Sequence, residues 1–274
     1  MKVSIITASY NYAQYLEEAI GSVISQAYGD WELIIVDDGS SDNSLEIINS
    51  FCDKDSRIKL FQHEGAENKG LKETLQLGLK NSSGDWVCFL ESDDVLKPQY
   101  LERKIEAIEK NPEAGLIFNK AEFLCESDNA QKKAQIFAKR QDELGKFAPS
   151  LNMFKDFAVF NPVLTFSCVM VKKDLIDCAN FDVKNEKFLD WWLWIHLAHE
   201  NKFVYVDEDL TIWRLHDSSY MGKDTGLSFA APPVEAYFDV FLKTGDFLVL
   251  PILIFSLVGF YAVRILNKCN KLAL

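Results

Sequence analysis

Short apolar runs alternate with helix-like segments through the first third of the chain. Four β-rich runs are separated by three segments whose apolar residues have helical spacing. The runs cover residues 3–9, 31–36, 57–62 and 86–90, and the helical segments cover residues 12–26, 42–51 and 70–80. Strand–helix–strand units of this length form right-handed crossovers between parallel strands. The sequence therefore predicts an α/β fold with a Rossmann-like, mostly parallel sheet and helices on both faces.

The second half of the chain is less regular. Helices are predicted at residues 98–111 and 189–200, and strand-like runs occur at residues 115–119, 164–171 and 203–206. Residues 126–145 are polar and charged, which is typical of an exposed excursion from the core.

Net charge, cysteine spacing and the N-terminal sequence limit the expected function and location of the protein. A formal net charge of -12 argues against nucleic-acid binding, which needs lysine and arginine to displace counterions. The six cysteines form no C-x-x-C pair, and several lie in apolar runs, so we predict reduced, buried thiols. The N-terminus enters an apolar strand directly and lacks a signal-peptide layout, so we expect the body of the protein in the cytoplasm.

Acidic residues occur where two of the predicted strands end. Asp37 and Asp38 follow the second strand, and Glu91, Asp93 and Asp94 follow the fourth. The carboxyl ends of parallel strands form the edge of a sheet where ligands bind. Clustered carboxylates repel one another, and Mg²⁺ or Mn²⁺ removes that cost while completing its coordination with phosphates and water. The alternative interpretation is that these residues form turns and helix caps.

Six motifs stand in the order found in glycosyltransferase family 2, and the chain resembles this family from Val3 to about His216. The motifs are VSIITASYN, WELIIVDDGSSDNS, ENKG, GDWVCFLESDDVLKP, FLDWWLW and IWRLH. The resemblance implies a GT-A domain over residues 1–220. It also implies transfer of a sugar, with inversion, from a nucleotide diphosphate to an acceptor hydroxyl, with Mg²⁺ or Mn²⁺ as cofactor.

The resemblance assigns donor binding to residues from several motifs. They are Ala8, Ser9, Tyr10, Asp38, Lys69, Glu91, Ser92 and Arg214. Asp38 is implied to accept a hydrogen bond from the base, and a carboxylate pairs well with the imide N–H of uracil, which favours a UDP-sugar. Glu91 stands where the family usually has aspartate, so the charge is kept but the side chain reaches further.

The metal ligands and the catalytic base are implied in the same way. Asp93 is the implied direct metal ligand, and Arg214 and His216 are implied to contact the diphosphate or to close over the metal. Asp190 aligns with the family's general base, which takes the proton of the attacking hydroxyl, although Leu189 stands where the family usually has a second acid. As structural alternatives, Asp190 is a helix N-cap and His216 a structural histidine.

Weaker assignments apply to Asp94, and to residues other than Asp190 in the tryptophan-rich helix predicted at residues 189–200. Asp94 and Trp191 are implied to face the acceptor, while core packing is the alternative role for the tryptophans. His196 and His199 have no carboxylate at metal spacing in the sequence, so we predict that they are surface or packing residues.

Three rival functions are weighed against a glycosyltransferase. A nucleotidyltransferase that makes activated sugars would have a Gly-rich, basic loop after the first strand, where this chain has SYNYAQYL. A non-catalytic carbohydrate-binding protein is supported only by the departures at Glu91 and Leu189. A dinucleotide dehydrogenase is excluded, because no G-x-G-x-x-G follows the first strand.

The C-terminal region has a different character from the α/β body. Residues 247–263 carry no charge, and Arg264, Lys268 and Lys271 follow. A helix of this length spans about 25 Å, which is marginal for a bilayer core of about 30 Å, and Pro251 would break or kink it near its start. Because basic flanks favour the cytoplasmic side, we expect residues 247–274 to attach to the cytoplasmic face of the inner membrane in a peripheral or re-entrant manner.

This expectation leaves several arrangements open. Residues 221–246 are predicted to be a linker or helical region between the catalytic domain and the apolar segment. A spanning helix, a buried core helix and an oligomer contact are alternatives for the apolar segment. The family resemblance permits either a saccharide or a polyprenyl-diphosphate-linked oligosaccharide as acceptor, and membrane attachment favours the second.

Overall fold

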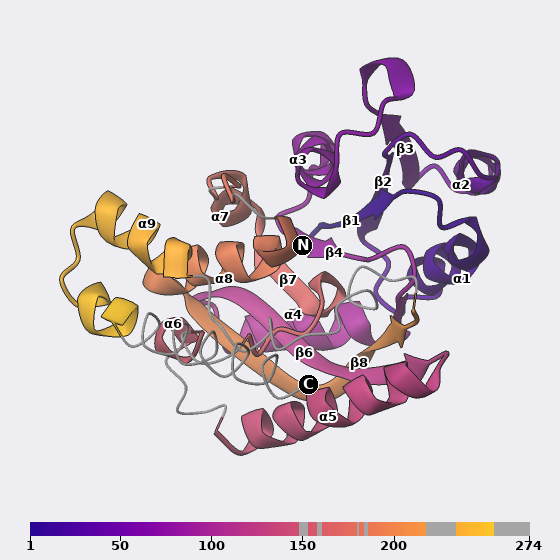
Figure 1. Ribbon diagram of the computed structural model, residues 1–274. Coiled ribbons are helices and arrows are strands. Elements are labelled where there is room, and N and C mark those ends of the chain that lie inside the picture. Colours follow the sequence, from indigo (N-terminus) through magenta and orange to yellow (C-terminus); the bar gives the residue numbers. More distant parts are fainter. Residues whose placement is uncertain (148–152, 158–160, 180, 184–185, 218–233, 255–274) are drawn as a thin grey trace, which may run out of the picture. The chain divides into compact units, whose positions relative to one another are not determined.

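The computed structural model describes residues 1–147, 153–157, 161–179, 181–183, 186–217 and 234–254 (Figure 1). The described residues form two compact units. The first unit comprises residues 1–124, 163–179 and 202–214, and the second comprises the described residues within 125–162, 180–201 and 215–254. The predicted boundary at residue 220 lies outside the described residues.

The strands of the described residues form one sheet in the order β3-β2-β1-β4-β7-β6-β8-β5. The strands are β1 (Val3–Ser9), β2 (Trp31–Asp37), β3 (Ile58–Gln62), β4 (Trp86–Phe89), β5 (Val95–Leu96), β6 (Ala114–Cys125), β7 (Val169–Lys172) and β8 (Lys202–Leu215). The pairs β3–β2, β2–β1 and β1–β4 are parallel, which confirms the predicted parallel α/β sheet for this part. The later pairs β4–β7, β7–β6 and β5–β8 are antiparallel.

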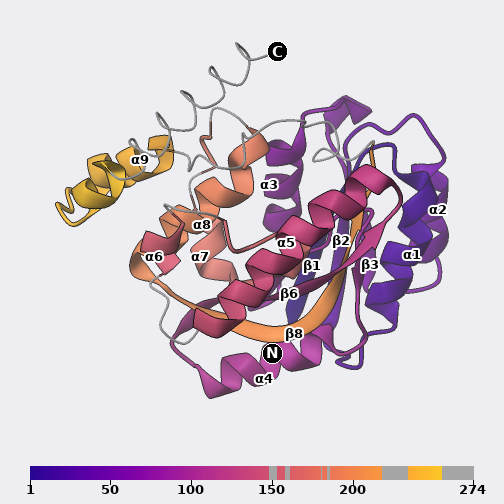
Figure 2. The same cartoon turned by 60° about the horizontal axis from the view of Figure 1, so that its bottom comes forward.

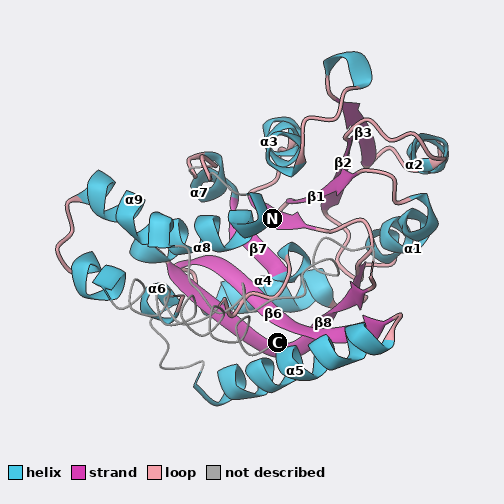
Figure 3. Ribbon diagram, viewed as in Figure 1, coloured by secondary structure: helices cyan, strands magenta, loops and turns pink. Residues whose placement is uncertain are grey.

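Helices cover both faces of the parallel strands, as predicted. In the first unit they are α1 (Ala13–Ile24), α2 (Ser44–Cys52), α3 (Leu71–Asn81), α4 (Tyr100–Lys110) and α7 (Lys173–Asp177). α1 and α2 lie on one face of β1, β2 and β3, and α3 lies on the other (Figures 1 and 2). The described residues of the second unit include the helices α5 (Asp128–Phe147), α6 (Met153–Asp156), α8 (Leu189–Glu200) and α9 (Val234–Thr244), and a further helical stretch at residues 249–254 (Figure 3).

The packing of β1 follows from the period of two in a strand, which sends alternate side chains to opposite faces. Val3 and Ile5 belong to the core that α1 closes with Leu16 and Ile20. On the other face, α3 approaches β1 so closely that a Cβ at Gly78 would lie 2.5 Å from the Ile6 side chain. Glycine at this position therefore permits the close contact between α3 and the sheet.

Several elements differ from the sequence prediction. The strand-like run at residues 115–119 extends to the 12 residues of β6, and the run at residues 164–171 is a strand only from Val169 onward. Residues 126–145, predicted to be an exposed excursion without an assigned helix, lie mostly in the 20-residue helix α5. The strand predicted at residues 203–206 extends to the 14 residues of β8. The acidic run at residues 207–209 is exposed in the middle of β8, so it hides the strand pattern without ending the strand.

Glu32 lies almost completely buried at the amino end of β2, where its carboxylate gathers a set of donors. These are the ammonium groups of Lys2 and Lys59, the hydroxyl of Ser4, and the amide and hydroxyl of Ser83. Burial alone would raise the pKa of Glu32, but these hydrogen bonds prevail and hold the pKa well below its usual range. The carboxylate therefore joins β1, β2, β3 and the loop before β4.

Glu32→Gln is expected to lower the free energy of unfolding at pH 7 by about 1–3 kcal/mol, because the buried donors lose their charged acceptor. The loss should shrink as the pH falls below about 4.3, where the unfolded chain takes up a proton that folded Glu32 does not bind. Urea unfolding of the variant and the wild type, at pH 7 and at a pH below about 4.3, measures the difference in the free energy of unfolding. Glu46→Gln, at an exposed position of α2, is the matched control, and an equal effect of the two substitutions would contradict the prediction.

Lys104 is a second buried charged residue of the first unit. Its side chain has no solvent exposure, and its ammonium donates to the carbonyl oxygens of Ile117 at 3.1 Å and Cys168 at 2.5 Å. The ammonium also lies 4.9 Å from the centre of the Tyr100 ring. Burial lowers the pKa of Lys104 to about 7. Through these contacts α4 is tied to β6 and to the residue that precedes β7.

Only part of the predicted membrane segment is described. Residues 249–254 are helical, with Pro251 in the first turn, where proline is tolerated. Residues 255–274 lie outside the described residues. In the part of the chain that the structure describes, no helix is both long and apolar enough to cross a bilayer. α9 falls inside the predicted linker or helical region, residues 221–246.

Candidate active site

The carboxyl ends of β1 and β2 lie side by side at one edge of the sheet. Asp38 follows β2, and its two carboxylate oxygens accept hydrogen bonds from the backbone amides of Lys69 at 2.7 Å and Gly70 at 3.0 Å. Gly39 has φ +79°, and a Cβ there would lie 2.7 Å from the carbonyl oxygen of Ala66. The D-D-G turn therefore holds the loop before α3 against the end of β2.

The residues predicted to bind the nucleotide meet at this edge in part. The Ser92 hydroxyl donates to the carbonyl oxygen of Ala8 at 2.8 Å, and the carbonyl oxygen of Ser9 accepts from the amide of Asp38 at 2.8 Å. Tyr10 is exposed. The ammonium of Lys69 forms an ion pair with a carboxylate two residues before it. The structure thus joins the ends of β1, β2 and β4, while the nucleotide contacts of these residues stay predictions.

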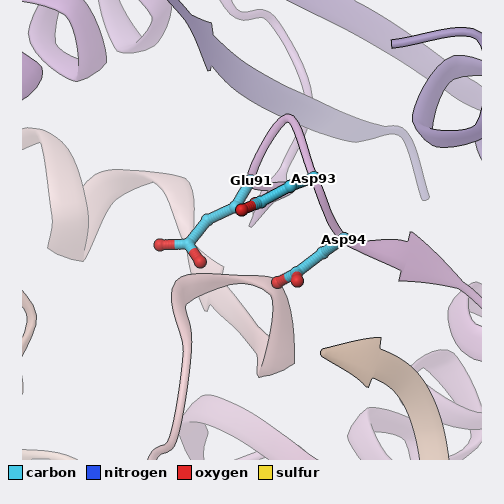
Figure 4. A group of neighbouring side chains, drawn as sticks. All are labelled: Glu91, Asp93 and Asp94. Carbon is cyan, nitrogen blue, oxygen red and sulfur yellow. The ribbon is translucent and has the colours of Figure 1, made fainter. Parts of the chain in front are cut away.

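Three carboxylates gather in the loop between β4 and β5 (Figure 4). Glu91, Asp93 and Asp94 each offer an oxygen, and these oxygens lie within 4.8 Å of one another. Burial and the charges of Asp93 and Glu91 raise the pKa of Asp94 well above its usual value. An all-oxygen donor set whose members disfavour one another's charge fits a hard divalent cation. This carboxylate cluster is the candidate metal site.

Thr165, which lies outside the six family motifs, supports the carboxylate cluster. Its buried hydroxyl lies 2.8 Å from a carboxylate oxygen of Glu91 and 3.1 Å from one of Asp94. Thr165 precedes the 3-10 turn η3 (Phe166–Cys168). In this turn the Ser167 hydroxyl accepts a hydrogen bond from the backbone amide of Glu91 at 2.9 Å. Thr165 and Ser167 therefore fix the position of the cluster from a segment more than seventy residues further along the chain.

Arg214, at the end of β8, packs against the same loop. Its backbone amide donates to the carboxylate of Asp94 at 3.0 Å, and its Nε donates to the carbonyl oxygen of Asp93 at 2.9 Å. Its guanidinium pairs with Glu18 and lies 4.8 Å from the ring centre of Tyr15. Arg214 is therefore part of the frame around the carboxylate cluster, and its predicted contact with the diphosphate stays a prediction.

Tyr12 is another residue near the cluster that was not predicted as a site residue. Burial raises its pKa, and the negative charges of Asp93 and Glu91 raise it further. The phenol therefore stays protonated over the physiological range, next to the candidate metal site.

Asp190 lies in the second unit, in the first turn of α8. The helix begins at Leu189 with Phe188 as its N-cap, so Asp190 is not the N-cap that the alternative interpretation required. Burial raises the pKa of Asp190 to about 6, although the Asn161 side chain donates to its carboxylate at 2.8 Å and opposes this shift. A carboxylate with this pKa is ionised at pH 7 and is a stronger base than an exposed aspartate.

The other predicted residues of the second unit are buried. Trp191 is buried, and its indole N–H donates to the carbonyl oxygen of Phe157 at 3.0 Å. His216 is also buried. The predicted roles of Trp191 at the acceptor and of His216 at the metal stay predictions. His196 and His199 pair with carboxylates of Asp239 and Asp246 at 2.8 and 3.0 Å, which agrees with their predicted packing role.

Comparison with known proteins gives a family and a fold. The family model for glycosyl transferase family 2 matches residues 4–179. A protein of Haemophilus influenzae described as an uncharacterized glycosyltransferase is 36% identical over 188 residues, which cover 68% of this chain and 68% of that protein. The glycosyltransferase GlyG of Streptococcus pneumoniae is 25% identical over 251 residues, which cover 86% of this chain and 78% of GlyG.

Solved structures show the same fold at low sequence identity. Residues 1–349 of S. aureus TarS, in complex with UDP-GlcNAc, match with a TM-score of 0.64 at 18% identity, covering 89% of this chain and 66% of that one. The mannosyltransferase PcManGT of Pyrobaculum calidifontis, in complex with GDP-Man and Mn²⁺, matches with a TM-score of 0.58 at 15% identity, covering 99% and 80%. At these identities the likeness shows the fold alone, which is the predicted α/β GT-A fold.

Proposed function

Because the chain belongs to glycosyl transferase family 2 and is a glycosyltransferase with the GT-A fold, we propose that it transfers a sugar from a nucleotide diphosphate donor to an acceptor. The configuration at the anomeric carbon of the sugar is inverted in this reaction. The favoured donor is a UDP-hexose or a UDP-N-acetylhexosamine. The proposed acceptor is a hydroxyl of a glycan or of a polyprenyl-diphosphate-linked oligosaccharide. The observation that carries this proposal is the carboxylate cluster of Glu91, Asp93 and Asp94 at the carboxyl edge of the parallel strands.

The carboxylate cluster suits a diphosphate leaving group only with a counter-charge. Mg²⁺ or Mn²⁺ held by Asp93, with Glu91 and Asp94 around it, would supply the charge that stabilises the departing diphosphate. Thr165 and Arg214 keep these carboxylates in place through the hydrogen bonds described above. PcManGT, which shares the fold, was solved with Mn²⁺, and this supports the choice of cation.

The acceptor side of the reaction requires a base. A sugar hydroxyl is a poor nucleophile, because it holds its proton far above neutral pH, and a positioned carboxylate can remove that proton as the hydroxyl attacks. Asp190 is the proposed base, supported by its place in the first turn of α8 and by the rise of its pKa to about 6. Asn161 donates to one of its carboxylate oxygens at 2.8 Å and so orients the proposed base.

A screen of nucleotide-sugar hydrolysis, with and without Mn²⁺, tests the proposed donor. UDP-sugars are expected to be turned over faster than GDP-, ADP- and CMP-sugars, and only with the divalent cation present. Release of free nucleotide diphosphate identifies a transferase reaction. Synthesis of a nucleotide-sugar from a sugar phosphate and a nucleoside triphosphate would instead indicate the nucleotidyltransferase alternative, and turnover of no donor would favour a non-catalytic binding protein.

Asp38→Asn gives a sharper test of base recognition. The variant is expected to weaken UDP binding, because a carboxamide replaces the charged acceptor of the uracil imide. Since Asp38 also holds Lys69 and Gly70, the thermal unfolding midpoint must be measured on the same variant. Unchanged affinity for UDP in a folded variant would contradict the role of Asp38.

A further inference from the structure

The described residues after residue 233 form a helical pair that we call the C-terminal hairpin (residues 234–254). It consists of α9, a turn at Gly245, and the helical residues 249–254. The Asp246 carboxylate accepts the amide of Leu248 at 2.8 Å, and the rings of Phe241 and Phe247 meet edge to face with centres 6.0 Å apart. These contacts give the turn a fixed geometry.

One side of the C-terminal hairpin is fastened to the helix that carries Asp190. His196 of α8 lies 2.8 Å from the Asp239 carboxylate of α9, and His199 lies 3.0 Å from the Asp246 carboxylate. In the same unit the Tyr237 hydroxyl donates to a carbonyl oxygen of α6 at 2.7 Å. The hairpin is therefore part of the second unit and follows any movement of α8.

Apolar side chains elsewhere on the C-terminal hairpin are exposed. Phe238 and Leu242 lie four residues apart on α9, so they share one side of that helix. The exposed fractions are 50% for Phe238, 64% for Leu242, 75% for Phe247, 79% for Leu248 and 60% for Ile254. Five exposed large apolar side chains on an element this short are typical of an interaction surface.

The charges of the chain point to the nature of the partner. From residue 247 to the last residue the sequence has three basic residues and no acidic one, whereas the 26 basic and 41 acidic residues before it give a net charge of -15. The exposed apolar residues thus lead into a sequence that is uncharged up to residue 263 and basic after it. Apolar and aromatic residues followed by basic ones are the composition of segments that lie on anionic membranes.

We propose that the C-terminal hairpin docks on an anionic lipid surface through Phe238, Leu242, Phe247, Leu248 and Ile254. A second copy of the chain is the competing occupant. Protein interfaces surround their apolar centre with a polar rim, whereas the sequence from residue 247 is uncharged up to residue 263 and basic after it, which favours lipid. The proposal rests on the proposed function, because it names the surface on which the acceptor is presented.

Docking would bring α8 to the acceptor. Asp190 and His199 lie on the same helix, about 14 Å apart along its axis at 1.5 Å per residue. Since His199 and His196 bind the hairpin, the proposed base keeps a fixed distance from the lipid surface. A lipid-linked sugar is held near the lipid surface, so docking brings it within reach of the base. Docking gives no such advantage to a soluble saccharide.

Flotation of the full chain with lipid vesicles tests the docking. Vesicles of phosphatidylcholine with phosphatidylglycerol should bind the protein more strongly than phosphatidylcholine alone. Leu242→Glu/Leu248→Glu is expected to lower the partition coefficient at least about tenfold, because two exposed leucines leave the lipid and two negative charges replace them. Ile136→Glu is the matched control, since Ile136 is 57% exposed on α5 in the same unit.

Three further results decide the interpretation. Equal partition of the double variant and the wild type would overturn the docking surface. If the wild type is a dimer that does not bind vesicles, and the double variant is a monomer, the surface belongs to an interface with a second copy. This result would also overturn the proposal. Hydrolysis of the soluble donor should be unchanged in the double variant. Loss of vesicle binding with intact hydrolysis therefore supports the docking, whereas a wild type without any donor turnover refutes the proposed function instead.

Discussion

Asp190→Asn is expected to reduce the transfer rate by about 10²–10⁴-fold while donor affinity stays close to that of the wild type. The reason is that asparagine keeps the size and one hydrogen-bond acceptor of Asp190 but cannot take a proton from the attacking hydroxyl. Steady-state kinetics with saturating donor measure the rate, and titration with UDP measures the affinity. A variant with wild-type turnover would show that another group is the base.

The pH dependence of kcat gives an independent test of Asp190 as the base. Because burial raises the pKa of Asp190 to about 6, the wild-type kcat should rise with pH through this value as the carboxylate becomes ionised. Asn161→Ala removes a hydrogen bond that favours the charged form, so this rise should move to higher pH. Asp182→Asn, at an exposed position of the same unit, is the control that should leave the profile unchanged.

Asp93→Asn is expected to lower turnover by about 10²–10³-fold and to weaken Mn²⁺ binding. Neutralising the charge of a departing diphosphate contributes several kcal/mol, and each 1.36 kcal/mol is a factor of ten in rate. Calorimetric titration with Mn²⁺ alone and donor turnover in excess chelator are the two measurements. Full activity in the presence of the chelator would refute the metal-dependent mechanism.

Thr165 allows a graded version of this experiment. Thr165→Val removes the hydroxyl that contacts Glu91 and Asp94, and the loss of such a supporting group typically costs about 10–100-fold in metal affinity. Thr165→Ser keeps the hydroxyl and should restore most of the affinity. Glu109→Gln, at an exposed position of α4, is the charge-matched control for Asp93→Asn. Equal effects of Thr165→Val and Thr165→Ser would assign Thr165 a packing role only.

The parallel part of the fold could be predicted because local and global signals agree there. Each strand from β1 to β4 is a short apolar run that ends in polar turn residues, and each helix between them has a regular apolar side. α5 was missed because its buried positions are small or polar, namely Ala130, Ala134 and Gln141, together with Leu144. Their helical spacing is invisible to a count of large apolar residues.

The candidate site was predicted where it depends on strand ends and missed where it depends on distant segments. Glu91, Asp93 and Asp94 are neighbours in sequence, so their grouping follows from one loop. Thr165 stands in the apolar run at residues 164–171, and only the folded chain brings its hydroxyl to the carboxylates. Asn161 likewise approaches Asp190 from 29 residues away. A single threonine or asparagine carries no pattern that marks such a contact in advance.

The burial of Lys104 makes the folding reaction exchange protons with the solvent. Its pKa is about 7 in the folded chain, whereas a lysine in an unfolded chain titrates near about 10.4. Between these values the unfolded chain binds a proton that the native chain has released, so the contribution of this residue to stability increases with pH. Below pH 7 the native core must instead keep a positive charge away from water, where it contacts two carbonyl oxygens and an aromatic ring. Mildly alkaline solution therefore removes this buried charge from the core.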